Sequence, residues 1–244
     1  MSKKEIIVYK IGGSLLKDRS ALKDTLKCLD INPGSSIFVH GGGDLIDTWM
    51  DRMNLEVNFV NGQRVTDEVT MDLVEMILSG LVNKDFSRVL AEMGFKSVGL
   101  SGRDAGLAEA DFIDIRLGRV GEIAELNGEI ITDLLDRNYV PVLSPVSMAP
   151  DGGKINVNAD FFAARIAANF KAKKFYIITS TGGVLKDGEK IKKVSCDGAK
   201  QLINDKVATV GMIPKLQAAV KAVNGGVKQV KLLDYEGNKG TCIK

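Results

Sequence analysis

The chain has 244 residues, of which 45% are hydrophobic and 26% charged, and its 33 basic and 31 acidic residues leave a net charge of +2. These values fit a globular protein with one large α/β domain or two lobes around a shared sheet. The interspersed charges exclude the basic stripe that nucleic-acid binding requires. The basic clusters at 171–174 and 190–193 are short and favour solvated loop or helix ends.

The cysteines and the hydropathy pattern indicate the compartment. Cys28, Cys196 and Cys242 have no metal-type spacing, and their odd number argues against a disulfide framework, so we expect a reducing cytoplasm. The apolar run at the N-terminus is too short for a signal peptide, and no stretch reaches transmembrane length. We therefore expect a cytoplasmic protein without a membrane partner.

The first part of the chain repeats a strand, a glycine turn and a helix. Apolar strands are predicted over 5–9 and 36–40, each followed by glycines, and helices over 20–29 and 44–53. This order predicts a parallel sheet wound with helices, in which ligands bind at the carboxyl ends of the strands.

The rest of the chain adds hairpins to this alternation and predicts a mixed sheet. The middle elements are a hairpin over 55–65, a long helix over 66–93, strands over 97–100 and 139–143, a helix over 130–137 and hairpin segments over 114–122 and 154–158. The last elements are strands over 174–179, 229–233 and 241–244, a hairpin over 186–192 and helices over 197–204 and 212–224. We place a soft lobe boundary near 170–173, because strand 174–179 can continue the same sheet.

Glycine-rich turns follow the first two predicted strands. Such turns let backbone N–H groups face an anion, because no Cβ intervenes and the next helix N-terminus adds partial positive charge. One turn alone is as often a plain tight turn. The pair at Gly12-Gly13 and Gly41-Gly42-Gly43 favours an anion cradle. The chain lacks both GxxxxGK[ST] and GxGxxG with an acidic partner, which excludes those two modes of nucleotide binding.

The run NVNAD, residues 156–160, precedes an apolar helical pattern. On extended backbone Asn156, Asn158 and Asp160 would point the same way, because the side-chain period of a strand is two. Helix capping explains one such residue but not three at alternating positions. We interpret the run as part of a site.

Two lysines, Lys10 and Lys215, lie at positions where a positive charge requires an anionic partner. Lys10 ends an apolar strand, and Lys215 lies at a helix start, where the macrodipole opposes a cation. A solvent-facing side chain is the alternative for Lys215. Both lysines beside a transferring phosphoryl group, with Asp160 to hold them, would stabilise the charge of the transition state.

Arg64 and His40 are the other polar candidates. Arg64 lies on a predicted loop and can hold a carboxylate bidentately, with a surface ion pair to Asp67 or Glu68 as the alternative. His40 is the only histidine, and no Ser/Asp pattern makes it a triad member, so we interpret it as structural.

Seven segments together resemble, in order and spacing, the amino acid kinase family. They are KIGGSLL (10–16), VHGGG (39–43), GQRVTD (62–67), SGRDAG (101–106), LGRVGEI (117–123), NVNAD (156–160) and GMIPKL (211–216). The match covers nearly the whole chain. RVTD, NVNAD and GMIPKL together resemble the branch that phosphorylates N-acetyl-L-glutamate.

The resemblance implies a three-layer αβα sandwich with a mostly parallel central sheet, in which residues 1–172 bind an acyl amino acid and residues 173–244 bind MgATP. Phosphate would pass to the γ-carboxylate in the second step of arginine biosynthesis, and a carboxylate needs no general base. By position, the catalytic residues are Lys10, Asp160 and Lys215, the substrate ligands are Gly42, Gly43, Arg64 and Asn156, and the ATP ligands are Lys10, Gly12, Gly13, Thr179, Gly183, Gly211 and Lys215. Asn158 remains a capping or structural residue. Mg²⁺ would arrive with the nucleotide, so no metal ligand is assigned to the protein.

Three departures from the family pattern affect these expectations. Ser180 stands where the family usually has an aspartate near the nucleotide, and the stretch 234–239 is shorter than the family's segment there. We expect ATP contacts to differ on that side. Asp44 follows the triple glycine where the family often has proline, and its charge is expected to influence the choice of an anionic substrate.

Two alternatives remain open. One is the same chemistry on an N-succinylglutamate or aminoadipate-type substrate, and the other is a non-catalytic amino-acid or nucleotide sensor on the same fold. RVTD favours the glutamate form, and the complete set of Lys10, Asp160 and Lys215 argues against a sensor. Because the chain begins at its first strand, without the N-terminal helix of arginine-inhibited hexamers, we expect a homodimer without arginine feedback.

Overall fold

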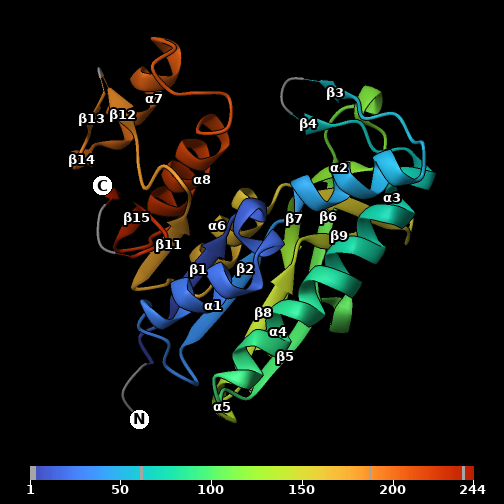
Figure 1. Cartoon of the computed structure of the whole chain (residues 1–244), viewed down its shortest axis with the longest axis horizontal. Coiled ribbons are helices and arrows are strands. Elements are labelled where there is room, and N and C mark those ends of the chain that lie inside the picture. Colours follow the sequence, from blue (N-terminus) through green and yellow to red (C-terminus); the bar gives the residue numbers. More distant parts are fainter. Residues whose placement is uncertain (1–3, 61–62, 187, 238–239) are drawn as a thin grey trace.

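The computed structural model describes residues 4–60, 63–186, 188–237 and 240–244. One eight-stranded sheet runs through the molecule, with helices on both faces (Figure 1). Its strands are β1 (Ile7–Ile11), β2 (Ser36–His40), β5 (Ser97–Ser101), β8 (Val140–Ser144), β11 (Lys174–Ile178), β14 (Lys193–Val194), β15 (Val230–Leu233) and β16 (Gly240–Ile243). They lie in the order β14-β16-β15-β11-β1-β2-β8-β5, and β15–β16 is the antiparallel pair. The predicted mostly parallel α/β sandwich is confirmed.

The helices follow the predicted ranges within a few residues, since apolar periodicity and glycine stops mark their ends. They are α1 (Arg19–Lys27), α2 (Gly43–Arg52), α3 (Glu68–Glu75), α4 (Asn83–Glu92), α5 (Glu129–Asp136), α6 (Ala159–Asn169), α7 (Cys196–Asn204) and α8 (Ile213–Asn224), with short 3-10 turns η1 (Gly13–Lys17), η3 (Asp104–Gly106) and η4 (Ile115–Leu117).

Alternating side chains on the central strands divide the core into two layers. Tyr9 on β1 packs in a cluster with residues of α1 and α4. Val8 packs in the opposite cluster, which contains residues of α5, α6 and α8. Successive side chains of a strand point to opposite faces, so Lys10 shares the face of Val8 and points toward α6. The strand period alone therefore places this lysine in the α6 layer.

The predicted helix over 66–93 is continuous but contains a π-helical segment, η2 (Met76–Val82), between α3 and α4. A π-helical turn holds one more residue than an α-helical turn, and such segments often occur at functional sites. Side chains after the segment are therefore rotated relative to those of a regular helix. The sequence pattern predicted the helix but not this change of pitch.

Four short strands form a closed barrel apart from the central sheet. They are β6 (Ala108–Phe112), β7 (Val120–Leu126), β9 (Val146–Met148) and β10 (Lys154–Val157). β6 and β7 form an antiparallel hairpin, and β10 pairs with β7 in parallel. The sequence placed the segments 114–122 and 154–158 in the central sheet, and this placement was wrong, because a hairpin pattern does not specify which sheet its strands join.

The two other predicted hairpins are present as β3 (Phe59–Val60) with β4 (Gln63–Arg64), and β12 (Leu185–Lys186) with β13 (Glu189–Lys190). Asn61, Gly62 and Asp187, which stand between these strands in the sequence, lie outside the described residues, as do residues 1–3 and Asn238–Lys239 of the short stretch 234–239.

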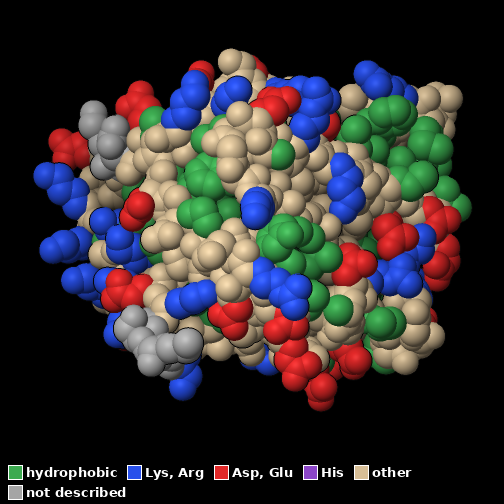
Figure 2. Space-filling view, turned by 90° about the horizontal axis from the view of Figure 1, so that it is seen from below, with side chains coloured by type: hydrophobic (Ala, Val, Ile, Leu, Met, Phe, Trp, Pro, Cys, Tyr) green, Lys and Arg blue, Asp and Glu red, His purple; other side chains and the backbone are tan. Residues whose placement is uncertain are grey.

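The surface carries both signs of charge. Lysine and arginine side chains are interspersed with acidic ones over most of the face in Figure 2. Within the described part of the chain, no helix is long and apolar enough to cross a membrane.

Candidate active site

The two glycine turns touch each other at the carboxyl edge of the sheet. β1 and β2 are neighbours, with Ile11 opposite His40. A Cβ on Gly13 would lie 3.1 Å from the Cα of Gly42 and 3.2 Å from the backbone nitrogens of Gly42 and Gly43. These nitrogens stand at the start of α2, whose first N–H groups have no partner within the helix. The predicted position of both turns on one sheet edge is confirmed, and the missing side chain of Gly13 leaves space in front of the N–H groups.

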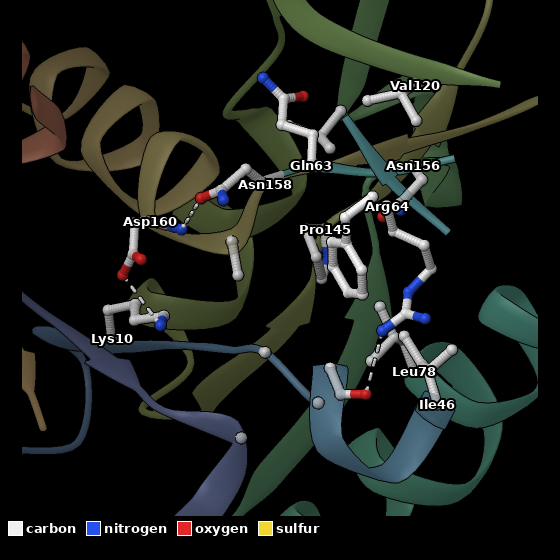
Figure 3. Close-up of a pocket in the computed structure, with 17 residues that line it drawn as sticks. Lys10, Ile46, Gln63, Arg64, Leu78, Val120, Pro145, Asn156, Asn158 and Asp160 are labelled. Carbon is white, nitrogen blue, oxygen red and sulfur yellow. Dashed lines mark hydrogen bonds and ion pairs between the residues drawn. The ribbon is translucent and has the colours of Figure 1, made fainter. Parts of the chain in front are cut away.

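A cavity of about 220 Å³ opens at this edge. Figure 3 shows Lys10 and Asp160 on one side of the cavity and Arg64 on the other. The predicted site residues that line it are Lys10, Gly13, Gly42, Gly43, Arg64, Asn156 and Asp160. Residues from four separate segments of the chain therefore meet at one concave site.

Asp160 lies between the two predicted catalytic lysines. Its Oδ1 is 2.8 Å from Lys10 Nζ, and its Oδ2 is 3.2 Å from Lys215 Nζ. Lys10 and Asp160 are only 5% and 4% exposed, and Lys215 is partly buried. The alternative of a solvent-facing Lys215 is therefore wrong. Two cations and one anion leave a net positive charge beside the glycine N–H groups, which suits a polyanionic ligand.

Burial and charge oppose each other in this group. Burial lowers the pKa of Lys10, although the Asp160 carboxylate acts in the opposite direction. Burial alone would raise the pKa of Asp160, but the ammonium groups of Lys10 and Lys215 outweigh it and lower that pKa. The two lysines therefore favour the ionised form of Asp160, and its charge offsets part of the effect of burial on Lys10.

The NVNAD run crosses from a strand to a helix. Asn156 is on β10, Asn158 is the N-cap of α6, and Asp160 lies in the first helical turn. The Oδ1 of Asn158 accepts hydrogen bonds from the N–H groups of Asp160, at 2.9 Å, and Phe161, at 3.4 Å. The capping interpretation of Asn158 is confirmed. The expectation of one extended run was wrong, because the helix begins at Ala159.

Arg64 is buried on β4 at the other end of the cavity. Its Nη2 lies 2.5 Å from Asp47 Oδ1 and donates to the carbonyl oxygen of Gly43 at 3.3 Å. The guanidinium also lies 4.9 Å from the centre of the Phe59 ring. The surface ion pair with Asp67 or Glu68 was the wrong alternative, since Asp67 caps α3 and Glu68 lies 3.4 Å from Arg119.

Asn156 belongs to the lining of the cavity, whereas Asp44, the residue after Gly43, does not. Asn156 donates from Nδ2 to Thr66 Oγ1 at 3.4 Å. Asp44 is half exposed and lies 3.9 Å from Lys17. The side chain of Asp44 therefore points to a surface lysine, whereas Gly43 and Ile46 on the same helix form the cavity wall.

His40 is fully buried beneath the glycine turn. Its Nδ1 is 2.9 Å from the carbonyl oxygen of Gly41, and its Nε2 is 3.1 Å from Asn83 Nδ2. Burial lowers the pKa of this histidine to about 4, so the ring is neutral at pH 7. The ring has no place in the cavity lining, which agrees with the structural interpretation.

The residues predicted for ATP lie farther along the same sheet edge. Gly12 and Thr179 follow directly after Ile11 and Ile178, which are opposite each other in β1 and β11. Gly183 is buried with a φ of 143°, and a Cβ there would lie 2.5 Å from Thr241 Oγ1. Gly211 is exposed in the turn before α8. Lys10 and Gly13 line the cavity, and Lys215 contacts Asp160, which lines it. Thr179, Gly183 and Gly211 are not among the lining residues.

The apolar wall of the cavity was not predicted from the sequence. This wall consists of Ile46, Phe59, Leu78, Val120 and Pro145, with Gln63 beside it. Phe59 and Gln63 belong to the predicted hairpin that carries Arg64, so their proximity to the site was available as a signal. Leu78 gave no signal, because its direction depends on the π-helical segment.

The fold and the site together define a phosphoryl-binding α/β protein, and comparison with known proteins identifies its family. The amino acid kinase family model matches residues 5–234. The acetylglutamate kinase of Petrotoga mobilis (strain DSM 10674 / SJ95) is 40% identical over 241 residues, covering 94% of this chain and 80% of its own length. The acetylglutamate kinase of Caldanaerobacter subterraneus subsp. tengcongensis is 41% identical over 240 residues, covering 93% of this chain and 79% of its own length.

The crystal structure of smu.665 from Streptococcus mutans UA159 matches with a TM-score of 0.87 at 31% identity, covering 98% of both chains. The chain belongs to the amino acid kinase family.

Proposed function

We propose that the protein is an ATP-dependent N-acetyl-L-glutamate kinase that acts in the second step of arginine biosynthesis. The observation that carries this proposal is the Asp160 carboxylate between Lys10 and Lys215, beside two glycine turns that touch each other. The named relatives at about 40% identity support N-acetylglutamate as the acceptor.

The chemistry needs electrostatic stabilisation rather than a base. An oxygen of the γ-carboxylate attacks the γ-phosphorus of ATP, the bond from that phosphorus to the β,γ-bridging oxygen breaks, and ADP leaves with the electron pair. The products are an acyl phosphate and ADP. Lys10 and Lys215 neutralise charge on the phosphoryl oxygens, Asp160 orients both lysines, and the N–H groups of Gly42 and Gly43 donate to the transferring group.

The acceptor lies between the phosphoryl position and Arg64. The Arg64 guanidinium is 2.5 Å from Asp47 and retains N–H groups for the α-carboxylate of the substrate. Asn156 also lines the cavity and binds neighbouring polar atoms of the substrate. The apolar side chains of Leu78, Val120 and Pro145 give the cavity a dry wall suited to an uncharged acyl group.

ATP enters from the second lobe, residues 173–244, along the edge formed by Gly12, Thr179, Gly183 and Gly211. Lys10, Gly13 and Lys215 complete its phosphate contacts. Mg²⁺ comes bound to the nucleotide. No group of three or more His, Cys, Asp or Glu side chains suited to hold a metal ion occurs within the described ranges.

A homodimer in the cytoplasm remains part of the proposal. Val69, Met76 and Leu81 on the long helix that includes η2 are 57%, 56% and 42% exposed, which supplies apolar surface for a second copy. Mass measured by light scattering tests the dimer, and Met76→Lys is expected to shift the mass toward that of a monomer. A monomeric wild type would contradict the dimer.

A hydroxylamine-trapping assay tests the function. Purified protein is incubated with MgATP, hydroxylamine and, in separate reactions, N-acetylglutamate, N-succinylglutamate or N-acetylaminoadipate. We expect an acyl hydroxamate chiefly with N-acetylglutamate, and a loss of signal in Lys10→Met. A larger signal with another acceptor would identify the alternative kinase, and no hydroxamate with any acceptor would reject the enzyme.

A further inference from the structure

His40 and Asn83 form a buried polar pair behind the glycine turn, outside the cavity. A carbonyl oxygen only accepts, so the 2.9 Å contact with Gly41 means that Nδ1 of His40 carries the proton. Nε2 then accepts a hydrogen bond from Asn83 Nδ2 at 3.1 Å. The positive charges of Lys10 and Lys84 add to burial in lowering the pKa of His40, which keeps the ring neutral with this proton on Nδ1.

Asn83 is itself held rigidly from several sides. It is fully buried at the start of α4, and its Nδ2 also lies 3.0 Å from the carbonyl oxygen of Val142 and 3.3 Å from that of Leu100, so its two hydrogens are shared among three acceptors. Its Oδ1 accepts from Lys84 Nζ at 3.1 Å. A Cβ on Gly99 would lie 2.0 Å from this oxygen, so the glycine leaves the space that Asn83 fills. The amide is therefore anchored to two strands of the central sheet.

The contact with His40 fixes the direction of a neighbouring N–H group. The Gly41 carbonyl and the Gly42 N–H belong to one planar trans peptide unit, in which they point in opposite directions. The hydrogen bond that turns the carbonyl toward His40 therefore turns the Gly42 N–H away from it. The space that a Gly13 Cβ would occupy lies 3.2 Å from the Gly42 nitrogen. A Gly42 N–H that is directed away from His40 can donate into that space.

The π-helical segment supports the turn at a second point. A Cβ on Gly42 would lie 2.6 Å from Leu78 Cδ2, so this leucine packs directly against the glycine. Leu78 and Asn83 come from the π-helical segment and the residue after it. One part of the long helix thus contacts the turn through Leu78 and, by way of His40, through Asn83.

We propose that His40 and Asn83 are positioning residues for phosphoryl transfer, which hold the Gly41–Gly42 peptide so that the Gly42 N–H points at the transferring group. This inference rests on the proposed kinase function. The two residues do not touch the substrate. They act by preventing rotation of the Gly41–Gly42 peptide, which would turn the Gly42 N–H away from the charge that develops on the phosphoryl group.

Variants at position 40 separate positioning from simple packing. His40→Asn retains an amide donor near the place of Nδ1, whereas His40→Gln carries its amide farther out, toward Asn83, and His40→Leu has no donor. We expect kcat with N-acetylglutamate to fall about 10- to 100-fold in His40→Leu and His40→Gln, and less than about fivefold in His40→Asn. The KM values for N-acetylglutamate and MgATP should change less than about threefold.

Asn83→Ala is expected to give the same kcat-specific loss. Ser79→Ala is its matched control, because Ser79 lies on the π-helical segment and makes a polar contact of 2.7 Å with Ser144 that does not reach the turn. Its kcat should stay within about twofold of wild type. The affinity for MgADP with aluminium fluoride and N-acetylglutamate, which mimics the transferring phosphoryl group, should fall in parallel with kcat.

The results distinguish this inference from the proposed function. Wild-type protein without activity on N-acetylglutamate would refute the function. Active wild type with unchanged kcat in a folded His40→Leu or Asn83→Ala would refute only the positioning role, and so would an equal loss in Ser79→Ala. If His40→Leu does not fold, His40→Asn and His40→Gln decide the matter, and equal kcat in these two variants would overturn the inference.

Discussion

The carboxylate of Asp160 and the ammonium group of Lys10 lie 2.8 Å apart at the end of the central strand β1, and both side chains are almost completely buried. A buried ion pair carries a desolvation cost that its own attraction only partly offsets, so it contributes little net stability. The role of this pair is to fix the position of the Lys10 ammonium group beside the glycine turns.

Loss of either lysine charge should abolish most of the turnover. Lys10→Met and Lys215→Met keep the length of the side chain but remove the charge that faces the phosphoryl oxygens, and we expect kcat to fall at least about 10²- to 10³-fold. Lys221→Met is the matched control on α8, since Lys221 is half exposed and pairs with Glu122. Steady-state kinetics should show the control within about twofold of wild type, and near-normal turnover in both lysine variants would refute their roles.

Asp160→Asn should cost stability as well as activity. The substitution leaves Lys10 and Lys215 close together without a counter-charge, which is expected to lower the free energy of unfolding by about 3–5 kcal/mol. Asp136→Asn breaks an exposed pair with Lys4 and should cost less than about 1 kcal/mol. Urea titration measures both. The double variant Lys10→Met/Asp160→Asn should recover part of the loss, and strict additivity would argue against coupling.

Gly13→Ala should impair the cradle without unfolding the protein. The new methyl group would lie 3.1–3.2 Å from the backbone atoms of Gly42 and Gly43, in the space proposed for phosphoryl oxygens. We expect kcat/KM to fall at least about tenfold, and Gly80→Ala, whose methyl group would enter open space, to stay near wild type. Equal kinetics in the two variants would show that the space before Gly13 is not used.

Arg64→Leu should weaken binding of the acceptor selectively. A charged hydrogen-bonded contact contributes about 1.5–3 kcal/mol, so KM for N-acetylglutamate should rise about 10- to 100-fold while KM for MgATP changes little. Arg52→Leu is the control, since Arg52 lies over the Trp49 ring at 5.0 Å and does not line the cavity. A rise in both KM values would indicate a general distortion of the site.

Stability should depend on pH through His40. Its pKa lies near 4 in the folded protein and near 6.5 in the unfolded chain, so the unfolded state binds the proton first as pH falls. The stabilising contribution is complete above pH 6.5 and is lost progressively toward pH 4. At about 1.4 kcal/mol for each pKa unit, the total loss is about 3 kcal/mol.

The corresponding measurement compares wild type with His40→Asn by urea unfolding from about pH 7.5 to about pH 5, a range that includes the ordinary pKa of histidine. The free energy of unfolding of wild type should fall relative to the variant as pH decreases below about 6.5. Parallel pH profiles would mean that His40 is not held neutral by the fold.

Much of this site followed from local sequence signals. Lys10 was conspicuous as a cation at the end of an apolar strand, and the strand period places it on the α6 side. The glycine turns were recognisable because glycines follow two strands that are close in sequence, and such strands pair in a parallel sheet. Asn158 followed from the preference of helix N-termini for a side-chain acceptor.

The remaining parts depended on packing that no local pattern encodes. The π-helical segment decides where Leu78 and Asn83 point, and an apolar helical period fits an α-helix equally well. The closed barrel arises because β7 and β10 pair with each other over long sequence separations. The contact between Asp47 and Arg64 could not be predicted, because an acidic residue on an amphipathic helix is normally expected to face solvent.

The pairing of β1 with β11 has a mechanical consequence. β1 and β11 lie on either side of the predicted boundary at residue 172 and are neighbours in one continuous sheet, with residues from Ile7–Lys174 to Ile11–Ile178 in register. Separating the parts of the chain before and after residue 172 as independent bodies would break this ladder of backbone hydrogen bonds. Lys10 lies within this ladder opposite Ile177, so the pairing of the two strands itself fixes the position of its backbone.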